Sequence, residues 1–213
     1  MIADHNTALR DLLTASNDFA GRTLSAEQIE QLVKYYALVL KWNRALNLTT
    51  ITQPEEFKQR HLHESFLVAK YLSPSIREAW DLGSGLGVPG IPLAVCEPAL
   101  QVRLVEANHK KAIFLEEVVA GLKLKNVRIE NYRFECLAAP TGEVALMARA
   151  VDKMGAMLSQ ILRLGNSAGQ LIILGTDALA KIVRREIAGE FKLEIIALPE
   201  SQNLFLIDAK RFT

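Results

Sequence analysis

The sequence lacks the features of a secreted or membrane-bound protein. Its 213 residues include two cysteines, Cys96 and Cys136, which fall in segments expected to be buried and lack the spacing of metal ligands. We therefore expect no disulfide, no metal site and a reducing cytoplasm. No apolar run approaches the length that spans a bilayer, and the N-terminus lacks the basic-then-apolar order of a signal peptide. These absences predict a cytoplasmic location and no membrane partner.

The sequence also has little net charge. The formal net charge is +1, so any binding to nucleic acid has to come from a local basic surface rather than from the field of the whole molecule. Half of the residues, 50%, are hydrophobic, which is enough for a sizeable core. A chain of this length suits one α/β domain with a small extension, and we expect a monomer.

The stretch Trp80–Gly90 is the most informative part of the chain. An apolar run ends in Asp81, four glycines follow between positions 83 and 90, and an apolar pattern then resumes. This order predicts a strand, a tight turn and the start of a helix. Glycines allow positive φ angles and a close approach of a ligand to the backbone. Such a turn typically holds a nucleotide or a nucleotide-like cofactor.

The glycine spacing leaves two cofactor classes open. The pattern Gly85-x-Gly87-x-x-Gly90 fits the dinucleotide fingerprint, which keeps an NAD(P)-dependent oxidoreductase as an alternative. Counted from Gly83, however, Val88 stands where the third glycine of that fingerprint belongs. Asp81 would also repel a pyrophosphate, whereas it could accept hydrogen bonds from loop amides or a cofactor amine. The form Asp-x-Gly-x-Gly-x-Gly resembles the first motif of methyltransferases that use S-adenosylmethionine (SAM).

The first 75 residues have helical periodicity. Apolar positions predict helices at 8–16, from Ser25 to about residue 49, from about residue 52, and at 66–72. Ser25 and Gln28 have the spacing of a capping box. We expect residues 1–75 to form a helical arm or cap on a cofactor-binding domain at residues 76–213, the two making one compact unit.

From residue 76 onward, strands alternate with helices. Strands are predicted at 79–82, 101–106, 127–130, 144–148, 169–175, 193–198 and 204–209, with helices at 91–96, 110–122, 154–162 and 179–187. We expect five β/α units and then two strands with no helix between them, which must be antiparallel. A dinucleotide fold would instead continue into a sixth parallel strand. The pattern favours a Rossmann-like α/β fold of the class I SAM-dependent methyltransferases, with a seven-stranded, mostly parallel sheet and an antiparallel last strand.

Several segments resemble the GidB family, also called RsmG. They are Trp42-Asn43-x-x-Leu46-Asn47-Leu48-Thr49, Arg60-His61, the run from Asp81 to Leu93, and Ala148-Arg149-Ala150. The resemblance implies a SAM-dependent methyltransferase that modifies N7 of a guanine in bacterial 16S ribosomal RNA, alone or in a small-subunit particle. The chain departs from the family pattern at Val144, at Ala107 and after Leu174. These departures keep open a SAM-binding RNA-assembly protein with weak or no turnover.

The resemblance and the predicted topology together give candidate cofactor contacts. Carried over by position, the family's contacts fall on Gly83, Val88, Phe134, Glu135 and Arg149. The residues themselves predict that Gly83 and Gly85 pass close to the methionine part, that Glu106 accepts the ribose hydroxyls, and that Phe134-Glu135 lies around adenine. Arg149 ends a strand at the carboxyl edge of the sheet, where ligands bind. Alternatively, Glu106 is a solvated strand end, Phe134 a core residue and Arg149 a surface ion-pair partner.

The substrate side is predicted less directly. By resemblance, Asn47, Arg60 and His61 are candidate RNA contacts. Basic residues that could bind phosphates, or simply form a solvated face, are Lys34, Lys41, Arg44, Lys58, Arg60, Lys110 and Lys111. Guanine N7 carries no proton, so we expect an alignment mechanism with no catalytic acid or base. A small-molecule methyltransferase, with the arm as a lid, is a further alternative.

Overall fold

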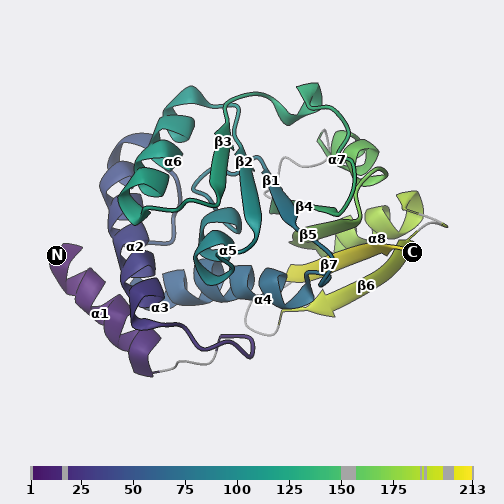
Figure 1. Cartoon of the computed structure of the whole chain (residues 1–213). Helices are drawn as coiled ribbons and strands as arrows, with labels where there is room; N and C mark the ends of the chain where they lie inside the picture. Colours follow the sequence, from purple (N-terminus) through teal and green to yellow (C-terminus); the bar gives the residue numbers. More distant parts are fainter. Residues whose placement is uncertain are drawn as a thin grey trace.

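The computed structural model describes residues 2–15, 19–149, 157–187, 189, 191–198 and 204–212. A seven-stranded sheet with the order β3-β2-β1-β4-β5-β7-β6 forms its centre (Figure 1). The strands are β1 Glu78–Leu82, β2 Gln101–Val105, β3 Val127–Glu130, β4 Val144–Arg149, β5 Gln170–Thr176, β6 Phe191–Ala197 and β7 Leu204–Arg211. Strands β1 to β5 pair in parallel, and β7 pairs antiparallel with both β5 and β6. The predicted sheet, with its reversed last strand, is confirmed.

Helices cover both faces of this sheet. They are α1 Ile2–Ala15, α2 Ala26–Leu46, α3 Pro54–Phe57, α4 Glu64–Tyr71, α5 Gly90–Cys96, α6 His109–Leu122, α7 Leu158–Gly165 and α8 Asp177–Glu186, with a π-helical segment η1 at Lys58–His63 and a 3₁₀ turn η2 at Phe134–Cys136. The first helix begins at residue 2, not 8 as predicted. The predicted start of α7, at residue 154, lies outside the described residues.

Between β3 and β4, residues 131–143 contain only the turn η2, so the third of the five expected β/α units has no full helix. Cys136 on this turn is therefore exposed, against the prediction that it is buried. Side chains cover part of the sheet instead. The Arg103 guanidinium lies 4.3 Å from the Trp80 ring centroid and 2.9 Å from the Glu78 carboxylate. This stacked cation shields Trp80, which remains only 6% exposed.

Two hydrophobic clusters separate the layers. One lies between the sheet and α7 and α8, and includes Trp80, Leu82 and Leu162. The other lies on the opposite face and joins the sheet to α5, α6 and the N-terminal helices, through residues such as Tyr35 and Phe66. Helix α2 packs directly on α5 and α6. Figure 1 shows α1 and α2 at one side of the molecule and β6 and β7 at the other.

Local sequence explains the ends of α2. Ser25 Oγ accepts from the backbone amide of Gln28, and the Gln28 side chain accepts from the amide of Ser25, which is the predicted capping box. At the other end Asn47 adopts a left-handed conformation with φ 48°, which asparagine tolerates better than most residues. The helix thus ends where the segment that reaches the candidate site begins.

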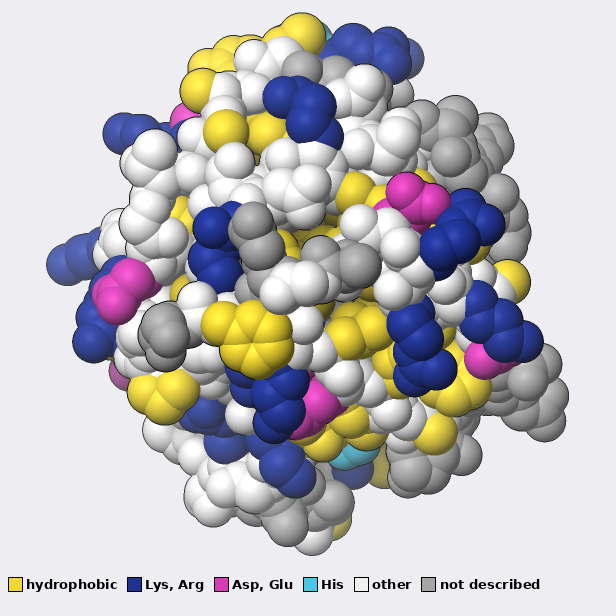
Figure 2. Space-filling view, turned by 90° about the vertical axis from the view of Figure 1, so that its right-hand side faces the viewer, with side chains coloured by type: hydrophobic (Ala, Val, Ile, Leu, Met, Phe, Trp, Pro, Cys, Tyr) yellow, Lys and Arg dark blue, Asp and Glu magenta, His cyan; other side chains and the backbone are white. Residues whose placement is uncertain are grey.

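The face formed by α8, β6 and β7 carries many basic side chains among hydrophobic ones (Figure 2). Two lysines of these elements have acidic neighbours: Lys181 of α8 lies 2.7 Å from Asp177, and Lys192 of β6 lies 2.7 Å from Glu194. Exposed ion pairs of this kind contribute little to stability. Within the described ranges, no helix is both long and apolar enough to cross a membrane.

Candidate functional site

The glycine-rich loop lies at the carboxyl end of β1 and is held on β2. The amides of Gly83 and Ser84 both donate to the Val105 carbonyl, at 2.8 and 3.0 Å. Gly83, Gly85 and Gly87 have φ angles of 75°, 58° and 94°, which side chains other than glycine rarely adopt. The predicted strand, tight turn and helix start are confirmed.

The space around each glycine differs. A Cβ at Gly87 would lie 2.6 Å from Cγ1 of Ile91, and one at Gly90 would lie 2.9 Å from Oδ2 of Asp81. Those two glycines are therefore required by packing within the loop. At Gly83 no atom of the described residues lies within 4 Å of the position that a Cβ would take. Gly83 leaves room beside the backbone, as close approach by a ligand requires.

Asp81 is a buried carboxylate beneath the loop. It is 1% exposed, and its Oδ2 accepts from the Gly90 amide at 3.2 Å. The prediction that this acid accepts from a loop amide is confirmed. Burial raises the Asp81 pKa to about 7, although the hydrogen bonds with Gly90 and Ser84 oppose this shift. The group thus titrates near neutral pH.

Glu106 follows β2 and holds the loop from the other side. Its Oε2 accepts from the Gly85 amide and its Oε1 from the Asn108 amide, each at 2.7 Å. The side chain is buried, so it is no solvated strand end. The sequence predicted that Glu106 accepts hydrogen bonds from the ribose hydroxyls. The structure adds two hydrogen bonds from backbone amides, which fix the position of the carboxylate.

Three other predicted cofactor contacts lie near the same edge. Val88 is 4% exposed, within the loop. Phe134 is 4% exposed and packs in the cluster that contains Trp80 and Leu82. Glu135 is the middle residue of η2, and its side chain lies outside the described part of the structure. Phe134 is thus a core residue at its present position.

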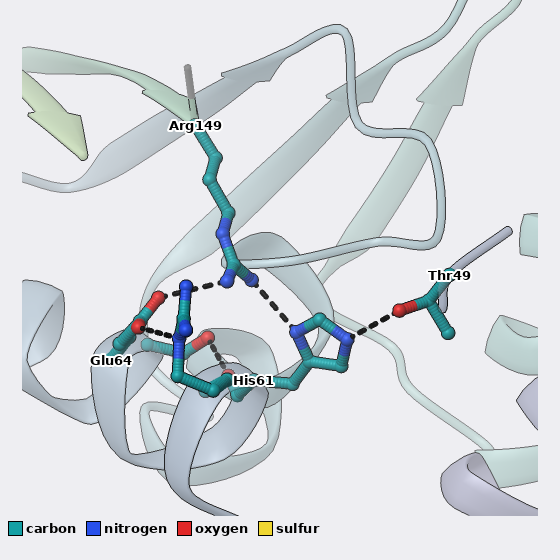
Figure 3. A network of polar contacts seen from close by, with 6 residues as sticks. Thr49, His61, Glu64 and Arg149 are labelled. Atoms are coloured by element: carbon teal, nitrogen blue, oxygen red, sulfur yellow. Dashed lines mark hydrogen bonds and ion pairs between the residues drawn. The ribbon is translucent and has the colours of Figure 1, made fainter. Parts of the chain in front are cut away.

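Arg149 ends β4 and points into a network with the N-terminal helices (Figure 3). One terminal nitrogen, Nη2, lies 2.9 Å from Glu64 Oε2, and Nη1 lies 2.8 Å from His61 Nδ1. Glu64 Oε1 also accepts from Arg60 Nε at 2.9 Å. The Glu64 side chain is 3% exposed and that of Arg149 17%. Arg149 is therefore a partly buried partner of a buried carboxylate, not a surface ion pair.

The network fixes the protonation of His61. A guanidinium only donates, so His61 Nδ1 must accept from Arg149, and the proton must sit on Nε2. Nε2 lies 3.0 Å from Thr49 Oγ1, to which it donates. Burial and the Arg149 charge lower the His61 pKa to about 3. With His61 neutral, two arginines face one carboxylate, which leaves a net charge of about +1 in this buried cluster.

The segment after α2 positions Thr49. The side-chain amide of Asn43 forms two hydrogen bonds with the Thr49 backbone. It donates to the Thr49 carbonyl at 2.8 Å and accepts from the Thr49 N–H at 2.9 Å. The Trp-Asn…Asn-Leu-Thr stretch therefore connects the end of α2 to His61. Asn47 is exposed on this turn. His61, predicted as an RNA contact, is 3% exposed with both ring nitrogens engaged, and so is not on the surface here.

The arm also touches the glycine loop. The hydroxyl of Tyr35, a fully buried residue of α2, donates to the Leu86 carbonyl at 2.8 Å. Most basic residues of the arm make internal contacts: Lys34 donates to the Gly121 carbonyl, Lys41 pairs with Glu117, and Lys58 donates to the Leu12 carbonyl. Lys34 and Lys41 thus join α2 to α6, and Lys58 joins η1 to α1.

Two buried groups, His61 and Asp81, should make the free energy of unfolding depend on pH in opposite directions. His61 titrates near pH 3 in the folded protein and near 6.5 when unfolded, so its contribution is lost as pH falls below 6.5. The Asp81 pKa is about 7 folded and 3.8 unfolded, so its contribution is lost as pH rises toward 7. From pH 7 to pH 5 each should change the free energy of unfolding by about 2 kcal/mol, with opposite signs.

Urea unfolding at the two pH values tests this. Relative to wild type, His61→Gln should gain about 2 kcal/mol on going from pH 7 to pH 5, and Asp81→Asn should lose about 2 kcal/mol. Parallel pH profiles for all three proteins would contradict the burial of these groups.

The strand order and the glycine loop define the class of fold, a Rossmann-like α/β fold with a reversed last strand. The tRNA (m1A58) methyltransferase TrmI from Aquifex aeolicus matches with a TM-score of 0.55 and 18% identity, over 78% of this chain and 71% of that one. A Streptococcus mutans methyltransferase structure in complex with SAH matches with a TM-score of 0.52 and 17% identity, over 68% and 96%. At such identities the likeness concerns the fold alone.

The sequence narrows the class to one family. Residues 28–199 match the GidB family, described as rRNA small subunit methyltransferase G. The ribosomal RNA small subunit methyltransferase G of Xylella fastidiosa (strain 9a5c) is 38% identical over 172 residues, which are 80% of each chain. The chain belongs to the GidB family, and it is an enzyme of the methyltransferase class.

Proposed function

We propose that this protein uses SAM to methylate N7 of a guanine in 16S ribosomal RNA. The observation that carries the proposal is the arrangement at the carboxyl edge of the sheet. There an open glycine, Gly83, lies in a loop bound to the buried carboxylates of Asp81 and Glu106. Family membership supports the choice of RNA as the substrate. We also propose that the protein acts as a cytoplasmic monomer, with residues 1–75 as a cap.

The residues present fit SAM. The space beside Gly83 admits a ligand against the backbone. The net positive cluster around Arg149 suits the carboxylate of the amino acid part, because its contacts with Glu64 and His61 engage two of the five guanidinium N–H groups among the described residues. Cofactor-side residues are then Gly83, Gly85, Val88, Glu106, Phe134, Glu135 and Arg149. When bound, SAM supplies an electrophilic methyl group.

The protein's own part in the reaction is alignment. Guanine N7 has an in-plane lone pair and no proton, so no residue has to act as a base. Buried Asp81 and Glu106 fix the loop, and the arm closes over it through Tyr35. A fixed, water-poor site holds two reactants in a reactive geometry. On the substrate side we propose Asn47 and Arg60, with His61 acting indirectly by holding Arg149.

Methyl transfer tests the proposal. Incubated with SAM labelled in the methyl group, the protein should label 16S RNA, supplied either as naked RNA or as small-subunit particles. Large-subunit RNA is the matched control and should stay unlabelled. Binding of SAM with no transfer to either form of the substrate would favour the RNA-assembly protein, and transfer only to small molecules would overturn the RNA proposal.

Binding measurements alone distinguish the oxidoreductase alternative from the proposed methyltransferase. Calorimetric titration should show micromolar binding of SAM or its demethylated product, and none of NADH. The departure at Val144 does not weaken this expectation, because Val144 pairs with Glu78 at the start of β1, at the sheet edge opposite the glycine loop.

A further inference from the structure

Tyr132 is an exposed aromatic residue beside the proposed cofactor site. It follows the edge strand β3 and is 52% exposed. A hydrogen bond to the Glu130 carboxylate raises the pKa of its hydroxyl. An exposed ring of this kind offers a face on which a planar partner can stack.

Two hydrogen bonds connect this turn to the loop region. His109 Nδ1 lies 3.0 Å from Oδ1 of Asn131, the residue before Tyr132. The Asn131 amide in turn donates to the Glu106 carbonyl at 2.8 Å. Since Glu106 also binds the Gly85 amide, Tyr132 is separated from the glycine loop by a short chain of contacts. A molecule on Tyr132 would therefore lie at the same carboxyl edge of the sheet as the proposed cofactor site.

Unpaired cations lie on the same rim. Lys110 and Lys111 occupy the first turn of α6, which contains no acidic residue. Among the described residues, neither forms an ion pair, in contrast to Lys181 of α8 and Lys192 of β6. Cations at a helix N-terminus are opposed by the helix dipole, so these lysines do not serve the stability of α6. Exposed Arg128 on β3 adds a charge that acts on Tyr132.

We infer that Tyr132, Lys110, Lys111 and Arg128 form a binding surface for single-stranded RNA next to the cofactor loop. An unpaired base stacks on the Tyr132 ring, and the three cations bind the phosphates beside it. Aromatic rings flanked by basic residues suit single strands, because every base offers a π-face and every nucleotide a phosphate. The choice of RNA rests on the proposed function, and the inference adds the place on the protein where that substrate binds.

Variants of Tyr132 test the stacking. With 16S RNA as the probe in a fluorescence anisotropy titration, Tyr132→Ala should raise Kd roughly five- to hundredfold, whereas Tyr132→Phe, which keeps the ring, should stay within about threefold of wild type. SAM affinity should not change. Phe212→Ala is the matched control, since Phe212 is 62% exposed and follows β7. Equal losses in both alanine variants, or a loss of SAM affinity in Tyr132→Ala, would overturn the inference.

A double lysine variant tests the phosphate contacts. Lys110→Gln/Lys111→Gln should make the slope of log Kd against log salt shallower by about one to two. Its Tm should be equal or higher, because the change removes cations from a helix N-terminus. If the two lysines served only to stabilise α6, the Tm of the double variant would fall instead. Lys181→Gln, a change on α8 away from this surface, should leave the salt slope unchanged.

The outcomes separate this surface from the proposed function. If Tyr132→Ala methylates 16S RNA with an unchanged KM, the surface is wrong and the function stands. If wild type binds RNA through Tyr132 but transfers no methyl group, the function falls and the surface stands. If the tyrosine and lysine changes abolish binding of an acidic peptide but not of RNA, the partner is a protein and the inference is overturned.

Discussion

Replacing Glu64 with alanine should lower the free energy of unfolding by about 3–5 kcal/mol. The Glu64 side chain is 3% exposed and is the counter-charge of Arg149, while it also binds Arg60. Its removal leaves a buried guanidinium facing a second arginine without compensation, and desolvated charges of this kind are costly. Urea unfolding followed by circular dichroism measures the change.

A surface pair provides the control for Glu64. Glu117 lies 2.8 Å from Lys41, with side chains 36% and 64% exposed, and Glu117→Ala should cost no more than about 1–2 kcal/mol, including its bond to Trp42. The double variant Glu64→Leu/Arg149→Met should recover most of the stability lost in Glu64→Ala, because it removes both buried charges. Similar small losses for Glu64→Ala and Glu117→Ala would show that the network in Figure 3 is not buried.

Gly83→Arg should abolish SAM binding, with a loss of more than about a hundredfold in affinity. Gly83 has a φ of 75° and open space where a side chain would begin. An arginine there is strained and occupies the space that the proposed cofactor needs. Calorimetric titration with SAM measures the effect.

Gly142→Arg is a matched control for Gly83→Arg. Gly142 has a φ of 83° and no atom within 4 Å of a Cβ position, so the backbone strain is similar. It precedes β4, at the sheet edge opposite the glycine loop. SAM affinity should therefore survive in Gly142→Arg. If both variants bind SAM as wild type does, the cofactor does not pass beside Gly83.

Most of the fold could be predicted because its signals are local. Alternating apolar runs predicted all seven strands, and the lack of a helical pattern between the last two predicted the reversed strand. The capping box was also predicted, from the spacing of Ser25 and Gln28 in the sequence. The stacking of Arg103 on Trp80 was not, since only the folded sheet brings the two side chains together.

The candidate site was predicted only in part, because its contacts are long-range. Asp81 and the glycines adjoin in the sequence, so their relation was visible. Glu64 carries no motif, and only folding brings it from an N-terminal helix to Arg149 at the end of β4. His61 was expected at the RNA surface, yet burial and two hydrogen bonds place it beneath Arg149. Tyr35 likewise reaches the loop from 51 residues away.

Nucleoside analysis of methylated 16S RNA tests the central claim most directly. Small-subunit RNA incubated with the protein and deuterium-labelled SAM would be digested to nucleosides and examined by mass spectrometry. The account predicts labelled N7-methylguanosine from wild type and none from Gly83→Arg. Label on an exocyclic amine, on a ribose hydroxyl or on another base would contradict the base-free alignment at N7. No label, despite SAM binding, would contradict the proposed activity itself.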